Sequence, residues 1–258
     1  IDDVRLFDRP LAFWEVNDLY FDALGFTNYP PSVAAGPDII LQDPSFQRQI
    51  PGQATDDDQP FGPPTITWTA ESGPGAPASV AFADPADPDT TASFATAGEY
   101  VLRLTIDDGA ETRFDETTVR VFDPLPSPWS NNDIGGVGAD GWAILSSPDT
   151  FELNASGRQI AGNPASNADS FHFVWRPLDG SGQALVARLD SADAADPDAR
   201  FGVMFRTGTS PAASANGLVA YAPGVGLVWQ NRSGTNGGTG GEVIDPDVAP
   251  PVWLRIHR

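Results

Sequence analysis

Between residues 65 and 122, apolar and polar positions alternate in short runs that stop at clusters of Gly, Pro and Asp. The apolar run from Val101 to Ile106 ends at Asp107-Asp108-Gly109, a turn signal that a strand does not run through. No apolar positions recur there at the helical spacing. Strands placed about 8–12 residues apart predict a small Greek-key sandwich.

A second alternating pattern occupies the last third of the chain. Gly-rich turns separate runs of β-branched and aromatic residues, which predicts a larger antiparallel sandwich. The predicted strands are 171–178, 184–190, 200–206, 217–224, 226–232 and 252–258. Together the two patterns predict an all-β fold class, with a Pro-rich linker at 124–130 between the sandwiches.

The first 27 residues show a different pattern. Val4 and Leu6 are typical of a strand, and apolar residues then recur every three or four positions between Phe13 and Leu24. Gly25 is a suitable helix stop. This segment therefore predicts one strand and one helix, which cannot bury a core alone.

The charge of the chain is strongly negative and unevenly distributed. Its 258 residues include 28 Asp and 7 Glu against 14 Arg and no Lys, for a net charge of −21. Such a chain repels nucleic acid and anionic lipid, so neither is expected as a partner. Residues 1–127 carry 22 of the 35 acidic residues. The acidity fits either solubility in a high-salt or calcium-containing medium or cation binding by Asp clusters.

Cysteine is absent, which excludes disulfides, thiolate metal sites and a cysteine nucleophile. No apolar run approaches the length of a membrane span, so no membrane insertion is expected. The chain begins at Ile1, which predicts a processed or trimmed N-terminus. These features fit a bacterial protein that is secreted or lies at the cell surface.

Residues 28–123 resemble the polycystic-kidney-disease-like immunoglobulin-like repeat (PKD or REJ type) of bacterial exoproteins. The matching motifs are PPSVAAGPD, TDDDQP, ITWTAESGPG and DTTASFATAGEYVLRLTIDDG. The resemblance implies an immunoglobulin-like Greek-key sandwich with a strand at 39–41 and another at 47–54. Trp68 and Tyr100 would then be core residues, on strand C and at the start of strand F.

Residues 1–27 resemble the end of a laminin-G-like (LamG) jelly roll, on the motifs IDDVRLFDR and EVNDLY. The resemblance implies that most of such a domain precedes Ile1.

Residues 131–258 resemble the DUF1349 family of concanavalin-like sandwiches, of the "regulation of enolase protein 1" type. The motifs are DIG (133–135), DSFHFV (169–174), VAR (186–188), GVMFR (202–206) and PPVWLR (250–255). That family continues with further strands beyond the segment that matches 252–258. The resemblance therefore implies a sandwich that is incomplete at its C-terminal end, with an edge open or covered by another chain.

The residue pattern does not favour catalysis. A serine nucleophile would need a base, but no G-x-S-x-G elbow is present and His172 alternates with Phe171 and Phe173 in a strand. His172 is therefore predicted to be structural. A glycosidase would need two carboxylates on one face, yet residues 128–258 contain only Glu152 and Glu242 as glutamates, far apart in sequence. The segment is not expected to be an enzyme.

Calcium is the candidate cofactor. Asp56, Asp57 and Asp58 fall in the loop between predicted strands B and C, and Asp107 and Asp108 follow strand F. These loops share one end of an immunoglobulin-like sandwich, so the five carboxylates would converge there. Calcium takes six to eight oxygen ligands, largely carboxylates and carbonyls. The alternative is a solvated acidic loop end.

Glycan binding would use aromatic rings together with neighbouring polar side chains. Arg206, Trp229 and Arg232 lie at or near strand ends, where loops can build a site, and are the candidate carbohydrate-binding residues. The alternative for any one aromatic residue on these strands is burial in the core.

The sequence therefore predicts a non-catalytic segment for spacing and adhesion, with polysaccharide or matrix glycan as its partner. Two alternatives stay open: an accessory region of a polysaccharide-degrading enzyme, and a subunit of an extracellular assembly completed by neighbouring chains.

Overall fold

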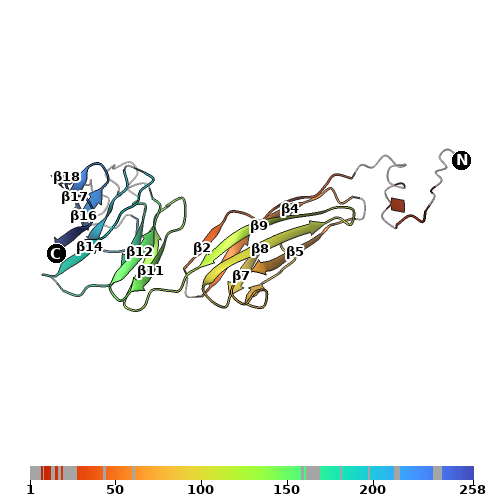
Figure 1. The fold of residues 1–258 in the computed structure, drawn as a ribbon, viewed down its shortest axis with the longest axis horizontal. Helices are drawn as coiled ribbons and strands as arrows, with labels where there is room; N and C mark the ends of the chain where they lie inside the picture. The colour runs from red at the N-terminus through yellow and green to blue at the C-terminus, as the bar shows by residue number, and fades with distance from the viewer. Residues whose placement is uncertain are drawn as a thin grey trace. The chain divides into compact units, whose positions relative to one another are not determined.

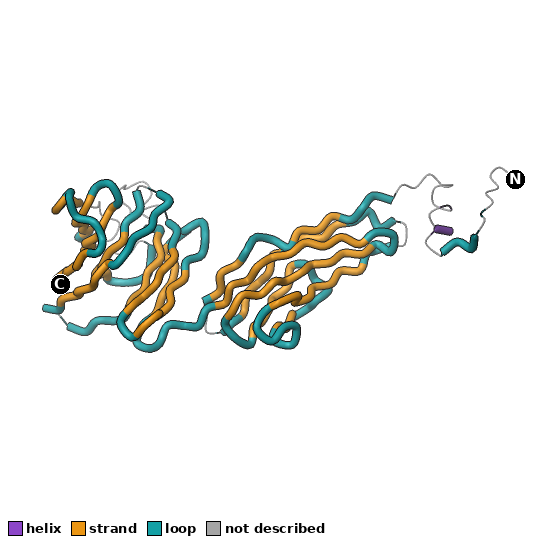
Figure 2. The backbone as a smooth tube through the Cα atoms, viewed as in Figure 1, coloured by secondary structure: helices purple, strands orange, loops and turns teal. Residues whose placement is uncertain are grey.

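A computed structural model gives the fold of the chain (Figures 1 and 2). It describes residues 7, 9–12, 15–16, 19, 28–42, 45–59, 62–157, 160, 169–180, 182–196, 198–211, 216–234 and 240–258. The chain divides into two compact units, Ile1–Pro124 and Leu125–Arg258. The boundary falls at the start of the predicted Pro-rich linker. Apart from a few helical residues near the N-terminus, the regular elements of the described residues are strands, as the all-β prediction requires.

Most of the predicted N-terminal strand and helix lies outside the described residues. Glu15, Val16 and Leu19 are helical, and the Val16 amide donates to the Ala12 carbonyl at 3.2 Å. The resemblance of this segment to a laminin-G-like jelly roll stays a prediction.

The first unit contains nine strands among its described residues. They are β1 (Ser32–Ala34), β2 (Ile39–Leu41), β3 (Gln47–Pro51), β4 (Gln53–Thr55), β5 (Thr65–Ser72), β6 (Val80–Phe82), β7 (Asp89–Phe94), β8 (Gly98–Asp107) and β9 (Thr112–Val121).

These strands have immunoglobulin-like connectivity. One sheet has the order β2-β9-β8-β5 and the other β3-β7-β6, while β1 pairs with β4. Figure 1 shows β2, β9, β8 and β5 following one another across one sheet. All of these pairs are antiparallel except β2 with β9. Strands B, E and D thus form one sheet and C, F and G the other, with an A′ strand parallel to G.

Trp68 and Tyr100 lie in the core of this sandwich, as predicted. Trp68 on β5 is 2% exposed and its indole N–H donates to the Pro88 carbonyl at 3.0 Å. Tyr100 is fully buried at the start of β8, and its hydroxyl donates to the Thr96 carbonyl at 2.9 Å. That bond ties strand F to the turn before it, as the tyrosine corner does in sandwiches of this kind.

The single strand predicted at 47–54 is wrong in one respect, because it breaks at Gly52 into β3 and β4. A Cβ at Gly52 would lie 2.5 Å from the Pro88 carbonyl oxygen and 2.7 Å from the Trp68 ring. The backbone therefore passes against the core tryptophan, and the chain leaves β7 to pair with β1.

The second unit contains ten strands among its described residues. They are β10 (Ser130–Ile134), β11 (Trp142–Ser147), β12 (Thr150–Asn154), β13 (Phe171–Trp175), β14 (Ala184–Leu189), β15 (Phe201–Arg206), β16 (Asn216–Ala222), β17 (Gly226–Arg232), β18 (Gly240–Asp245) and β19 (Val252–His257). All pairings are antiparallel: β10 with β13, β11 with β12, β14 with β19, and the sheet β15-β16-β17-β18.

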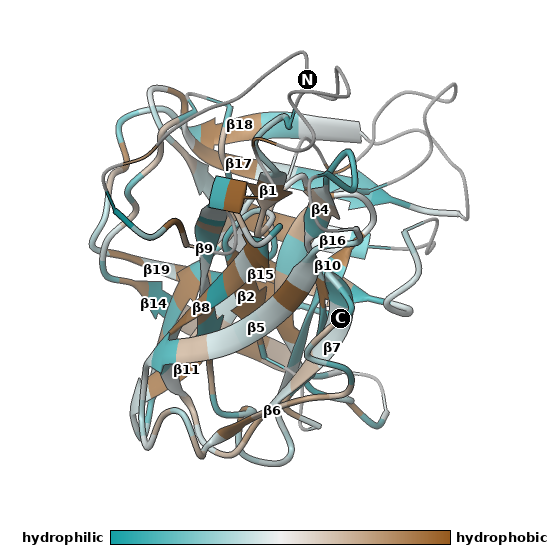
Figure 3. Cartoon of the chain, turned by 90° about the vertical axis from the view of Figure 1, so that its right-hand side faces the viewer, coloured by the Kyte–Doolittle hydropathy of each residue, from teal (hydrophilic) through white to brown (hydrophobic). Residues whose placement is uncertain are grey.

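The four-stranded sheet buries side chains on both faces. Met204, Leu218 and Val228 pack with Phe171 and Phe173 of β13 on one face. Val219 packs with Leu254 and Ile256 of β19 on the other. Strands that are buried on both faces carry apolar residues in succession, as Leu218-Val219-Ala220 of β16 do, and Figure 3 colours the strands by hydropathy.

The six strands predicted between 171 and 258 are all present, with ends shifted by at most three residues. The pattern did not identify β10, β11, β12 or β18, whose sequences are SNNDI, WAILSS, TFELN and GGEVID. Three of these are largely polar or contain glycine, whereas β11 begins with four apolar residues that do not alternate with polar ones. The concanavalin-like assignment of this unit stays a prediction. No helix in the described part of the chain is long and apolar enough to cross a membrane.

Candidate functional site

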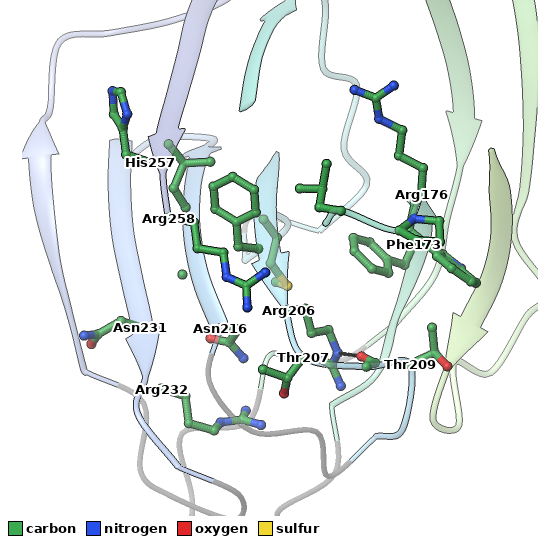
Figure 4. Close-up of a pocket in the computed structure, with 18 of the residues that line it drawn as sticks. Phe173, Arg176, Arg206, Thr207, Thr209, Asn216, Asn231, Arg232, His257 and Arg258 are labelled. Carbon is green, nitrogen blue, oxygen red and sulfur yellow. Dashed lines mark hydrogen bonds between the residues drawn. The ribbon is translucent and has the colours of Figure 1, made fainter. Parts of the chain in front are cut away.

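The second unit contains a pocket of about 630 Å³ beside the edge strand β15 (Figure 4). Its walls come from the ends of β13, β15, β16, β17 and β19 and from the residues that follow β13 and β15. A volume of this size lies within the range of small-molecule sites, which are mostly apolar with a few placed polar groups.

Three polar side chains lie directly opposite one another on the neighbouring strands β15, β16 and β17. Asn216 on β16 is the cross-strand partner of Arg206 on β15 and of Arg232 on β17. Directly opposite residues of neighbouring strands project to the same face. All three side chains therefore lie on the face that carries Met204 and Leu218.

The two arginines are held by one buried carboxylate, Asp169. Nη1 of Arg206 donates to Asp169 Oδ2, and Nη2 of Arg232 donates to Oδ1 at 2.5 Å. The Asp169 side chain is 0% exposed and each arginine side chain is 1% exposed. Two buried guanidiniums thus share one carboxylate, so the group keeps one excess positive charge.

The backbone fixes Asp169 in this position. Its amide donates to the Pro211 carbonyl at 3.0 Å. Gly135, at φ +72°, passes so close that a Cβ there would lie 2.1 Å from the Asp169 carbonyl oxygen. A side chain at position 135 would displace the segment that carries the carboxylate.

Asn216 differs from its neighbours because its amide has no partner. The residue is 5% exposed, and neither Nδ2 nor Oδ1 makes a hydrogen bond. Figure 4 shows the side chain at the pocket, between Arg232 and Arg206. A buried amide without a partner costs about 1–3 kcal/mol, so this group is available to a ligand that both donates and accepts.

Phe173 of β13 supplies an aromatic wall on the face of the sheet that carries Asn216. Trp229 of β17 also borders the pocket, but its side chain projects to the opposite face, where it packs with Val219 and with β19. The indole of Trp229 lies against Gly217, where an added Cβ would come within 2.9 Å of the ring. Glycine at 217 therefore lets the indole lie flat on the neighbouring strand.

The structure brings the three predicted glycan-binding residues to one pocket, but in different states. Arg206 and Arg232 line it with guanidiniums that are buried against Asp169, and Trp229 is half-buried. Sequence reasoning missed Asn216 as a site residue. The turn at Pro223–Val225 could have revealed it, because counting back from that hairpin sets Asn216 opposite Arg232.

His172 has a structural environment. Its side chain is 1% exposed, and Nδ1 lies 2.8 Å from Asp133 Oδ1. Nε2 lies 3.3 Å from Nδ2 of Asn131, which can only donate. Nε2 is then the acceptor and Nδ1 carries the proton, so the ring is held between two strands. That the segment is non-catalytic stays a prediction.

The predicted calcium loops do meet at one end of the first unit. Asn28 Nδ2 donates to Asp108 Oδ2 at 3.3 Å, and the Tyr29 amide donates to Asp57 Oδ2 at 3.3 Å. The loop backbone already uses several of the carboxylates. Asp108 Oδ1 accepts from the amides of Ala110 and Glu111, and Asp107 Oδ1 accepts from that of Gly109.

Asp56 has one buried carboxylate oxygen without a hydrogen bond. Burial raises its pKa, the charges of Asp108 and Asp57 add to the rise, and the backbone amides of Asp58 and Asp57 oppose it. Oδ1 of Asp56 and Oδ1 of Asn28 are both buried without a hydrogen bond. Across the ranges described, however, no three Asp, Glu or His side chains gather closely enough to hold a metal ion. Calcium binding by Asp56, Asp57, Asp58, Asp107 and Asp108 stays a prediction.

Comparison with known proteins gives limited likenesses. No family model matches the chain, and no curated protein does. Among solved structures, the chain is similar to the PKD domain from KIAA 1837 protein, at 23% identity and TM-score 0.30 over 38% of this chain and 93% of that one. The PKD domain of human KIAA0319 matches at 17% identity and TM-score 0.30, over 36% of this chain and 81% of that one.

A chimeric titin Z1Z2, functionalized with a KLER exogenous peptide from decorin, matches at 13% identity and TM-score 0.27. That match covers 38% of this chain and 99% of the other. At such TM-scores the immunoglobulin-like fold of the first unit rests on its own strand order, given above.

Proposed function

We propose that this chain is a non-catalytic segment of a secreted or cell-surface protein, in which the first unit is a spacer and the second binds a glycan. The observation that carries the proposal is the unpartnered amide of Asn216 in a pocket that Phe173 lines on the same face of the sheet. Sugar hydroxyls both donate and accept, as a carboxamide does, and sugar rings offer an apolar face to an aromatic ring.

The stability cost of Asn216 supports this role. A leucine at 216 would avoid the unpaired amide, yet the chain places a polar group there. Local choices that lower stability concentrate at functional sites. The amide is therefore best explained by a ligand that completes its hydrogen bonds.

The test compares Asn216→Leu with the unchanged chain in a glycan array and in a thermal melt. We expect the variant to lose glycan binding and also to melt at a higher temperature, because the unpaired amide is gone. Gln230→Leu, on the same face and also with a buried unpartnered oxygen but not at the pocket, is the control. A variant that binds normally, or an unchanged chain that binds no glycan, would overturn the proposal.

The two alternatives stay predictions. An accessory role in a polysaccharide-degrading enzyme would require a catalytic domain in the same gene. Assembly with neighbouring chains would appear as concentration-dependent mass in sedimentation equilibrium.

A further inference from the structure

Arginines are frequent among the residues that line the pocket of the second unit, whereas acidic residues are absent from its lining. Residues 128–258 contain 8 arginines and 13 acidic residues. Four arginines line the pocket, at positions 176, 206, 232 and 258, and none of the 13 acidic residues does. In a chain of net charge −21, this is a local region of positive charge.

The arginines have different roles there. Arg206 and Arg232 both form ion pairs with Asp169, and their combined charge exceeds that of the single carboxylate. Arg176 lies at the rim with its guanidinium 5.1 Å from the centroid of the Trp129 ring. Arg258 directly follows β19, is exposed, and lines the pocket together with Asn216 (Figure 4).

We propose that the pocket is specific for a carboxylate-bearing sugar, a uronic acid unit of an acidic polysaccharide. This inference rests on the proposed glycan-binding function. The carboxylate is placed against Arg258, a hydroxyl against the amide of Asn216, and the apolar face of the sugar against the aromatic wall. A guanidinium matches the planar carboxylate, and hydrogen bonds to charged groups are about twice as strong as neutral ones.

The negative charge elsewhere limits which anions can bind. At physiological salt, charges more than about 8 Å apart are largely screened, so an anion in the pocket interacts mainly with the charges next to it. A nucleic acid presents a much denser line of charge and would meet net repulsion over its length. An oligosaccharide with one carboxylate per ring needs only the local positive region.

The experiment is calorimetric titration of the full chain with acidic oligosaccharides. The probes are oligomers of galacturonate, mannuronate and hyaluronan, each beside its carboxyl-reduced, neutral form. We expect at least one acidic oligomer to bind about tenfold or more tightly than its neutral form. Arg258→Gln should remove that difference, whereas Arg255→Gln, on β19 just before Arg258 and outside the pocket, should preserve it.

The outcomes separate the two proposals. Equal binding of acidic and neutral forms would overturn the uronate inference while glycan binding stands. Failure of every acidic and neutral oligosaccharide to bind would overturn both. Binding of a glutamate hexapeptide that Arg258→Gln abolishes, without saccharide binding, would point to a protein partner and also overturn both.

Discussion

Asp169→Asn removes the charge of Asp169 and leaves the shape of its side chain nearly unchanged. The carboxylate is fully buried and is bonded to two guanidiniums that are each 1% exposed. Removing one partner of a buried ion pair typically costs about 3–5 kcal/mol, because the remaining charge is left uncompensated. Here two guanidiniums lose their counter-charge, so we expect the free energy of unfolding to fall by about 3–5 kcal/mol.

For a unit of this size, such a loss lowers the melting temperature by about 10–20 °C. Differential scanning calorimetry of the full chain measures it. The control is Asp190→Asn, which breaks the exposed 3.1 Å pair with Arg188 and should cost less than about 1 kcal/mol.

A charge-free replacement separates unpaired charge from lost packing. In the triple variant D169L/R206M/R232L no charge is buried, and such replacements of buried ion groups are often neutral or stabilising. We expect it to recover most of the melting temperature that D169N loses. If D169N costs no more than D190N, Asp169 does not hold the arginines as described.

Three further predictions concern the first unit. Tyr100→Phe should lower the free energy of unfolding by about 1 kcal/mol, because it removes the hydrogen bond to the Thr96 carbonyl. Tyr29→Phe, at an exposed residue, should leave the free energy of unfolding in urea unchanged. Asp56→Asn should raise the melting temperature at pH 7. The folded-state pKa of Asp56 is raised, so its ionised carboxylate lowers the stability of the fold as pH rises through that pKa. Below the ordinary pKa value of 3.8 the carboxyl is protonated in the folded and unfolded states alike, and this loss is absent. The gain in melting temperature from Asp56→Asn should therefore shrink toward about pH 3.5. An equal gain at both pH values would contradict this. If the loops bind calcium, millimolar calcium should raise the melting temperature above that in chelator, and no shift would exclude the site.

Most strands of the first unit could be predicted from the sequence, because alternation and turn residues are local signals. The resemblance to the PKD-like repeat predicts the burial of Trp68 and Tyr100. The break at Gly52 was not predictable, because it results from the distant Pro88 and Trp68 passing against the backbone.

The site was only partly predictable for the same reason. Arg206 and Arg232 are at strand ends, where an arginine is expected to be exposed, and periodicity alone cannot show that Asp169 buries them. Asp169 lies 37 and 63 residues away in sequence. Hairpin register, in contrast, places Asn216 beside both arginines, so the polar row could be derived once the strands were known.

The central claim is that a glycan completes the hydrogen bonds of Asn216. Its side-chain amide pair gives two ¹H–¹⁵N signals, which can be assigned by their loss in Asn216→Leu. Titration of the labelled chain with the tightest-binding acidic oligosaccharide should shift both signals saturably, with the dissociation constant found by calorimetry. Saturable binding that leaves both signals in place would contradict the claim.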